Sequence, residues 1–70
     1  MKQVRANMAG IVLRICVQTG EQVSAGQDLI VLESMKMEVP IQAESAGKVE
    51  EIKVNVGDFI NEGDLALILV

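Results

Sequence analysis

The segment from Glu33 to Glu38, with the sequence E-S-M-K-M-E, holds the residues of this 70-residue chain best placed to do chemistry. It sets Lys36 between two methionines, where two apolar, strand-like runs meet. A two-residue hairpin turn normally contains Asn-Gly or a similar pair, because both central residues need positive φ. Met35-Lys36 breaks this local rule, and such breaks are expected at functional sites. One interpretation is therefore that the hairpin displays the lysine amine to a partner protein. The same partner would contact the flexible methionine side chains.

A plainer interpretation fits the same pattern. In it, Met35 or Met37 points into the core, and Lys36 is an ordinary surface charge. Glu33 and Glu38 are then the solvated ends of their strands. The pattern alone favours neither interpretation over the other.

The composition excludes most other chemistry. The chain has no His and one Cys, which rules out a Ser-His-Asp triad, a His-ligated metal and an internal disulfide. Its net charge is −4 and Phe59 is its single aromatic residue, so we expect no nucleic-acid partner. The longest apolar run, Leu65–Val70, is too short to cross a bilayer, so no membrane partner is expected. No acid/base pair, nucleophile–base pair or phosphate loop is visible, which favours a carrier or an interaction module over an enzyme.

The expected location is cytoplasmic. No signal peptide opens the chain, and a single Cys suits a reducing compartment. A comparable organelle is the alternative if a targeting segment preceded this sequence.

The elements that position the E-S-M-K-M-E segment read as β-strands. Val and Ile dominate the apolar residues, Gly recurs between short apolar runs, and no long stretch has helical periodicity. Pro40 cannot donate a ladder hydrogen bond, so its strand is expected at a sheet edge or with a bend. Strands are expected over Gln3–Ala6, Ile11–Val17, Leu29–Glu33, Met37–Ala43, Lys48–Val54 and Ala66–Val70.

An internal repeat organises these strands. Ala9–Gly26 and Ala46–Gly63, which are 37 residues apart, share the frame A-G-x-V-x-x-I-x-V-x-x-G-x-x-[VI]-x-x-G. Two such halves, each too small for its own core, predict two facing sheets related by a pseudo-two-fold axis. The three-residue step from Val12 to Ile15 predicts a β-bulge or strong bend, repeated at Val49 to Ile52. The same symmetry predicts neighbouring termini, with Lys36 at the opposite tip.

The repeat also assigns residues to faces. Phe59 is expected to fill the core or to cap one end of the barrel. Positions at which the two halves carry unlike residues are expected to face solvent, namely Leu13, Arg14 and Cys16, which match Glu50, Glu51 and Lys53.

The E-S-M-K-M-E segment resembles the E-A-M-K-M-E segment of biotin carboxyl carrier proteins and biotinyl domains. The agreement extends to G-x-x-V-x-x-G-Q from Gly20, A-G-x-V from Ala46 and G-x-x-I-x-x-G from Gly57. The chain looks most like small biotin/lipoyl attachment proteins, or a carrier domain of a larger biotin enzyme. The resemblance implies an all-β fold, a flattened β-barrel (barrel-sandwich hybrid) of two four-stranded antiparallel sheets with a pseudo-two-fold internal repeat. Residues 1–70 are expected to form a single biotinyl/lipoyl-attachment domain.

The resemblance implies a non-enzymatic carrier. Lys36 would bind biotin through an amide, formed by a separate biotin protein ligase from biotinyl-adenylate. The domain would then shuttle carboxybiotin between a biotin carboxylase and a carboxyltransferase, most simply as a monomer without a metal. Met35 and Met37 would flank the lysine as recognition residues. Further recognition by the ligase and other partners is assigned to Glu33, Ser34 and Glu38.

Two other functions stay open. Lipoyl domains share this fold and the hairpin lysine, but usually present Asp-Lys-Ala at the tip. Met35 and Met37 replace that Asp and Ala here, which favours biotin over lipoate and over a 2-oxo acid dehydrogenase-type complex. The third hypothesis is an unmodified barrel-sandwich module used for protein contacts, which has no reason to keep a lysine between two methionines.

Overall fold

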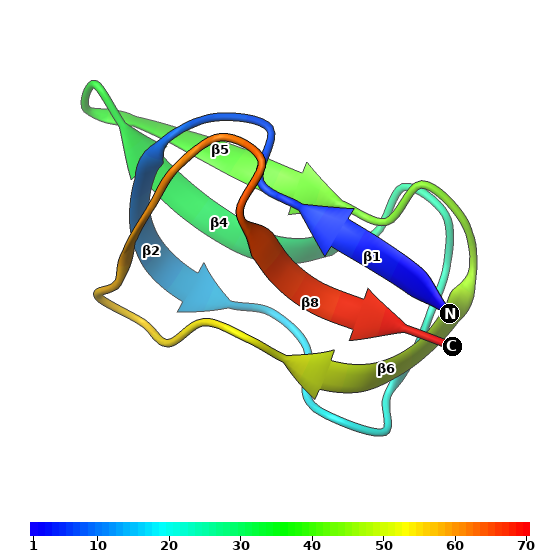
Figure 1. Cartoon of the computed structure of the whole chain (residues 1–70). Helices are drawn as coiled ribbons and strands as arrows, with labels where there is room; N and C mark the ends of the chain where they lie inside the picture. The colour runs from blue at the N-terminus through cyan, green and yellow to red at the C-terminus, as the bar shows by residue number, and fades with distance from the viewer.

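The chain folds into eight β-strands, which a computed structural model describes over all 70 residues. They form two four-stranded antiparallel sheets, ordered β1-β8-β6-β3 and β5-β4-β2-β7 (Figure 1). The predicted all-β fold of two four-stranded sheets is confirmed. The structure contains no helix of the length and hydropathy needed to span a bilayer. The strands are β1 (Lys2–Arg5), β2 (Gly10–Ile15), β3 (Gln22–Val23), β4 (Asp28–Ser34), β5 (Met37–Gln42), β6 (Gly47–Ile52), β7 (Phe59–Ile60) and β8 (Leu65–Leu69).

The six expected strands all form, with ends that differ by one or two residues at most sites. β3 and β7 were not expected, because each contains two residues and so has no periodicity to detect. Pro40 lies in β5, which is an edge strand, as its missing backbone donor predicted.

The internal repeat is visible in the backbone hydrogen bonds. β2 and β6 begin 37 residues apart, as do β3 and β7. Gly20 N donates to Val49 O, and the symmetry-related Gly57 N donates to Val12 O, both at 2.8 Å. Because β3 pairs with β6 and β7 pairs with β2, each half contributes one short strand to the other half's sheet. Neither half can therefore complete its sheet without the other.

Both predicted irregularities are β-bulges. The register of β2 against β4 shifts between Val12 and Arg14, and that of β6 against β8 shifts between Val49 and Glu51. The extra residue lets Val12, which is 1% exposed, and Ile15 both pack against the core despite their odd spacing.

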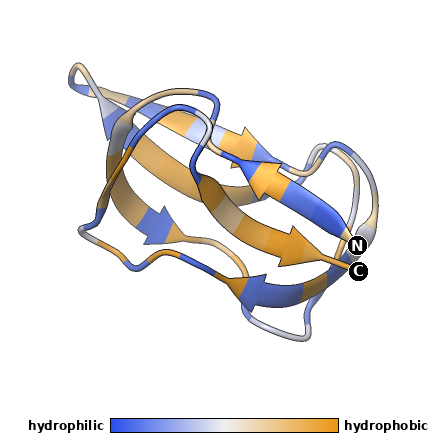
Figure 2. Ribbon diagram, in the orientation of Figure 1, coloured by the Kyte–Doolittle hydropathy of each residue, from blue (hydrophilic) through white to orange (hydrophobic).

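The core lies between the two sheets and is entirely apolar. No polar or charged side chain is buried. Figure 2 shows the continuous apolar stretches along β4 and β8, one of the two interior strands of each sheet. β4 is therefore held on the core from Leu29 to Leu32, two residues before the turn begins to form at Ser34. The largest fully buried side chains are Leu29, Ile30, Leu32, Leu67, Leu69, Val12, Val23 and Val49.

The prediction for Phe59 is wrong. Its side chain is 65% exposed and lies opposite Ile11 across the β2–β7 pair. Side chains alternate along a strand, and Ile60, at 5% exposure, takes the inward position of β7. Leu13 is half-buried rather than exposed, while the other five positions assigned to solvent are exposed.

Candidate functional site

The hairpin that joins β4 to β5 turns in two residues. Ser34 pairs with Met37, and Met35 and Lys36 form the turn between them. Their φ angles are 53° and 65°, and they are the two residues other than glycine with positive φ. A type I′ turn requires this conformation at both central positions, and it costs about 1–2 kcal/mol for each residue with a Cβ. The chain accepts this cost at one place, the apex that carries Lys36.

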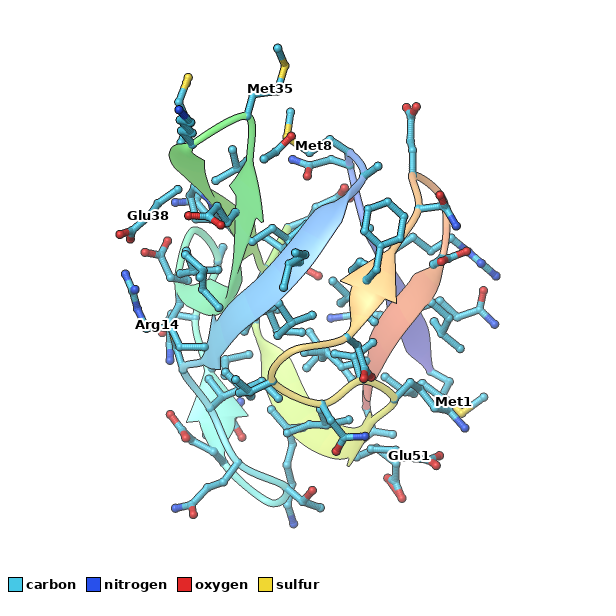
Figure 3. The ribbon with its side chains drawn as sticks, turned by 90° about the vertical axis from the view of Figure 1, so that its left-hand side faces the viewer. Met1, Met8, Arg14, Met35, Glu38 and Glu51 are labelled. Carbon is cyan, nitrogen blue, oxygen red and sulfur yellow. The ribbon has the colours of Figure 1, made fainter.

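The side chains at the apex point into solvent. Met35 is 92% exposed and Met37 is 64% exposed, so the interpretation that placed one of them in the core is wrong. Figure 3 shows Met35 projecting from the tip. Lys36 is also exposed, and it takes part in neither ion pair of the protein and in none of its side-chain hydrogen bonds. The amine is thus free to react with a group brought to it.

A close approach of two strands supports the hairpin. A Cβ added to Gly10 in β2 would lie 2.6 Å from the carbonyl oxygen of Glu33, just before the turn. Only glycine permits β2 to run so close to β4 at this point. The sequence analysis used Gly10 as a mark of the repeat and missed this role in the site. Its signal was the shared Ala-Gly that opens each half.

An ion pair holds one of the two acidic residues beside the turn. Glu33 and Glu38 lie directly opposite each other in the β4–β5 pair, an unfavourable position for two like charges. Arg14 reaches across from β2 and pairs with Glu38 at 2.8 Å (Figure 3). The hydrogen bond to Glu38, together with its negative charge, raises the pKa of Arg14 above its ordinary value. Arg14 therefore orients Glu38, a role that the sequence analysis did not foresee.

The tip is a projection and has no pocket of its own. The one groove of the surface, of about 380 Å³, is lined mainly by β1 and by the segment from Ile41 to Ser45. No cluster of three or more His, Cys, Asp or Glu side chains is arranged to bind a metal ion. The hairpin can thus present a nucleophilic amine, and neither Glu33 nor Glu38, the carboxylates on the same hairpin, forms an ion pair with it.

The structure brings the predicted site residues together on one hairpin. Ser34 is half-buried at the end of β4, while the other five are exposed. Met8, which was not predicted as part of the site, lies at the same end of the molecule as Met35 (Figure 3) and packs partly on the core. The grouped residues are Glu33, Ser34, Met35, Lys36, Met37 and Glu38.

Two facing four-stranded sheets that display a lysine at the apex of a two-residue hairpin have the architecture of a biotinyl or lipoyl attachment domain. The chain belongs to the biotin/lipoyl family, because the family model described as "Biotin-requiring enzyme" matches residues 2–69.

Individual relatives agree with this assignment. The chain is 48% identical to the biotin/lipoyl attachment protein of Bacillus subtilis over 64 residues, 91% of this chain and 88% of that protein. It is 44% identical to the biotinylated protein TB7.3 homolog of Mycobacterium leprae, over 97% of this chain and 96% of that protein. Among solved structures, urea carboxylase from Kluyveromyces lactis superposes with a TM-score of 0.94 at 30% identity. That match covers 99% of this chain and 6% of the carboxylase.

Proposed function

We propose that this protein is a biotin carrier in which Lys36 is the attachment residue. The observation that carries the proposal is the free, exposed lysine at the strained apex of the hairpin, in a chain of the biotin/lipoyl family. Homologous domains of this kind are carriers rather than catalysts. Their chemistry belongs to the attached cofactor, while the protein supplies position and recognition.

Attachment needs little from the domain except display of the amine. A biotin protein ligase supplies biotin as an acyl adenylate. The Nζ atom of Lys36 attacks the acyl carbon, a C–N bond forms, and the C–O bond to AMP breaks. AMP leaves with the electron pair, and the two protons lost from the ammonium group pass to bases of the ligase or to solvent. The product amide has no charge, so the net charge changes from −4 to −5.

Once loaded, the domain serves two partners of the carboxylase class, for which we propose a biotin carboxylase and a carboxyltransferase. Bound biotin supplies a ureido nitrogen that accepts CO₂ at the first site and gives it to an acceptor at the second. Tethering keeps the local concentration of the cofactor high at both sites. Met35 and Met37 offer adaptable apolar contacts at the tip, and Glu33 and Glu38 contribute the charges that orient the approach.

Biotin is favoured over lipoate by the residues next to the lysine. Met35 and Met37 are both exposed, so they are accessible to a ligase that distinguishes them from the Asp and Ala of lipoyl domains. The relatives named above are a biotin/lipoyl attachment protein, a homolog of a biotinylated protein and a urea carboxylase. Lipoyl attachment remains the second outcome of the test described next.

Intact mass spectrometry tests the proposal. The purified domain is incubated with biotin protein ligase, ATP and biotin, and in parallel with lipoyl ligase, ATP and lipoate. We expect one biotinyl group per chain, lost in Lys36→Arg and kept in the matched control Lys48→Arg, which changes another exposed lysine. A lipoyl adduct alone would transfer the domain to lipoyl chemistry. No adduct with either ligase would favour an interaction module without a cofactor.

A further inference from the structure

An exposed apolar pair lies on the outer surface of the sheet that carries the hairpin. Ile11 in β2 is 43% exposed and pairs with Phe59 in β7, which is 65% exposed. On its other side Ile11 pairs with Glu33 in β4, which in turn pairs with Glu38 in β5. These four residues, here called the Phe59 face, form one row across the sheet. The row ends beside the hairpin, so it is continuous with the attachment site. Figure 3 shows β2 and β7 from the front, with Met35 above them.

The fold itself does not require apolar residues at these positions. The pseudo-two-fold axis relates Ile11 to Lys48 and Phe59 to Gln22, and these two residues pair with each other on the opposite sheet. Both are polar and exposed there. An apolar pair is thus present on only one of two equivalent backbone positions, the one next to the hairpin. Exposed aromatic and aliphatic side chains placed in this way mark protein-binding surfaces.

The charges around the pair define the partner that fits. Glu33 and Glu38 border it on the hairpin side, whereas the carboxylate of Asp58, which precedes Phe59, accepts a hydrogen bond from Asn55 N at 2.9 Å in the turn before β7. Arg14, the basic residue nearby, is already paired with Glu38. A surface with an apolar centre and an acidic border complements an apolar patch bordered by Lys or Arg. A second copy of this chain is disfavoured, because it would bring two acidic borders together.

We infer that the Phe59 face docks on the biotin protein ligase that modifies Lys36, an inference that rests on the function proposed above. The free lysine side chain is shorter than the biotinyl-lysine arm that later enters the carboxylase sites. The ligase must therefore approach the body of the domain more closely than those enzymes do. A standard interface buries about 800 Å² on each partner. The surface of this domain is 4206 Å², so an interface centred on the hairpin extends well onto one flanking face.

A double substitution tests the docking surface. Ile11→Lys with Phe59→Gln introduces the residue types that the symmetry-related positions already tolerate. With a purified bacterial biotin protein ligase, ATP and biotin, we expect kcat/KM for the domain to fall about tenfold or more, since each of the two changes removes a central apolar contact. The matched control, Gln22→Ala with Lys48→Ala, changes the equivalent pair on the other sheet and should stay within about twofold of the unsubstituted domain. Far-UV circular dichroism and thermal unfolding establish that both variants fold.

The contribution of the acidic border is measured separately, by a substitution at Glu33. Glu33→Gln should lower kcat/KM and weaken its dependence on salt concentration, because Glu33 steers a basic surface. An unchanged kcat/KM in the folded Ile11→Lys, Phe59→Gln variant, with Lys36 still biotinylated, would overturn the docking surface and leave the carrier function intact. A dimer in sedimentation that this variant abolishes would assign the face to a second copy instead. Failure to biotinylate the unsubstituted domain would remove the proposed function and the docking surface together.

Discussion

At the scale of single residues, the turn at the hairpin apex lowers the stability of the domain but exposes the side chains of Met35 and Lys36. Asn-Gly would occupy positive φ at both turn positions with little strain, yet the chain has Met35 and Lys36 there. The proposed attachment of biotin requires the lysine, and the exposed side chain of Met35 is available for apolar contact with a partner. Strain that persists at an otherwise regular turn is typical of sites where selection acts on function.

The strain is measurable. Met35→Asn with Lys36→Gly should stabilise the domain by about 1–2 kcal/mol, because both residues then suit a type I′ turn. In a domain of this size that raises Tm by roughly 4–8 °C for each kcal/mol. Thermal unfolding at fixed pH and protein concentration measures the change.

A control separates backbone strain from the loss of the side chains. Met35→Ala with Lys36→Ala removes both side chains but keeps a Cβ at each positive-φ position, so it should give no comparable rise in Tm. Equal stabilisation by both variants would mean that the side chains, rather than the backbone, carry the cost.

At the scale of elements, the sequence predicted what depends on pattern and missed what depends on close packing. Glycine spacing and apolar tracts located six strands, and the odd step from Val12 to Ile15 located a bulge. All six residues assigned to the hairpin lie on it, since a contiguous motif needs no tertiary information. Arg14 was missed because its ion pair with Glu38 spans three strands and is visible only once the register is known. Phe59 was misplaced because a two-residue strand gives no alternation from which to assign its face.

Close packing of β2 on β4 gives a second prediction. Gly10→Ala should destabilise the domain by about 1–3 kcal/mol, because its Cβ would lie 2.6 Å from the carbonyl oxygen of Glu33, in backbone that cannot move freely. The symmetry-related Gly47→Ala is the matched control. Its Cβ would lie 3.0 Å from the carbonyl oxygen of Val70, a less severe approach than the 2.6 Å at Gly10. Urea unfolding of the two variants should therefore rank Gly10→Ala as the less stable. The reverse order would show that β4 adjusts more readily at Glu33 than the backbone does at Val70.

At the scale of the whole molecule, the two ends of the fold have equivalent backbone arrangements, but one end carries the lysine hairpin and the other carries the termini. The β4–β5 hairpin is related by the pseudo-two-fold axis to the gap between β8 and β1, where Lys2 pairs with Leu69 and the termini lie side by side (Figure 1). The molecule measures 31 Å along its longest axis, and the termini and the β4–β5 turn that contains Lys36 lie towards opposite ends of it. A protein fused to either terminus would therefore leave the β4–β5 hairpin accessible.

This equivalence specifies how the termini can be joined. Two repeats of 37 residues require 74, which is four more than the 70 present. A four-residue linker from Val70 to Met1, with Asn-Gly at its centre, should therefore extend the β8–β1 pair into a second two-residue hairpin. Because joining the ends reduces the conformational entropy of the unfolded chain, the cyclic protein should be more stable by about 2–4 kcal/mol, as for a cross-link that closes a long loop.

Denaturant unfolding should compare the cyclic protein with a linear chain that carries the same four residues at its C-terminus. Biotinylation of Lys36 should proceed at the same rate in both, because the new turn lies at the opposite end. A cyclic protein no more stable than the linear control would show that the ends of β8 and β1 do not continue the symmetry of the hairpin.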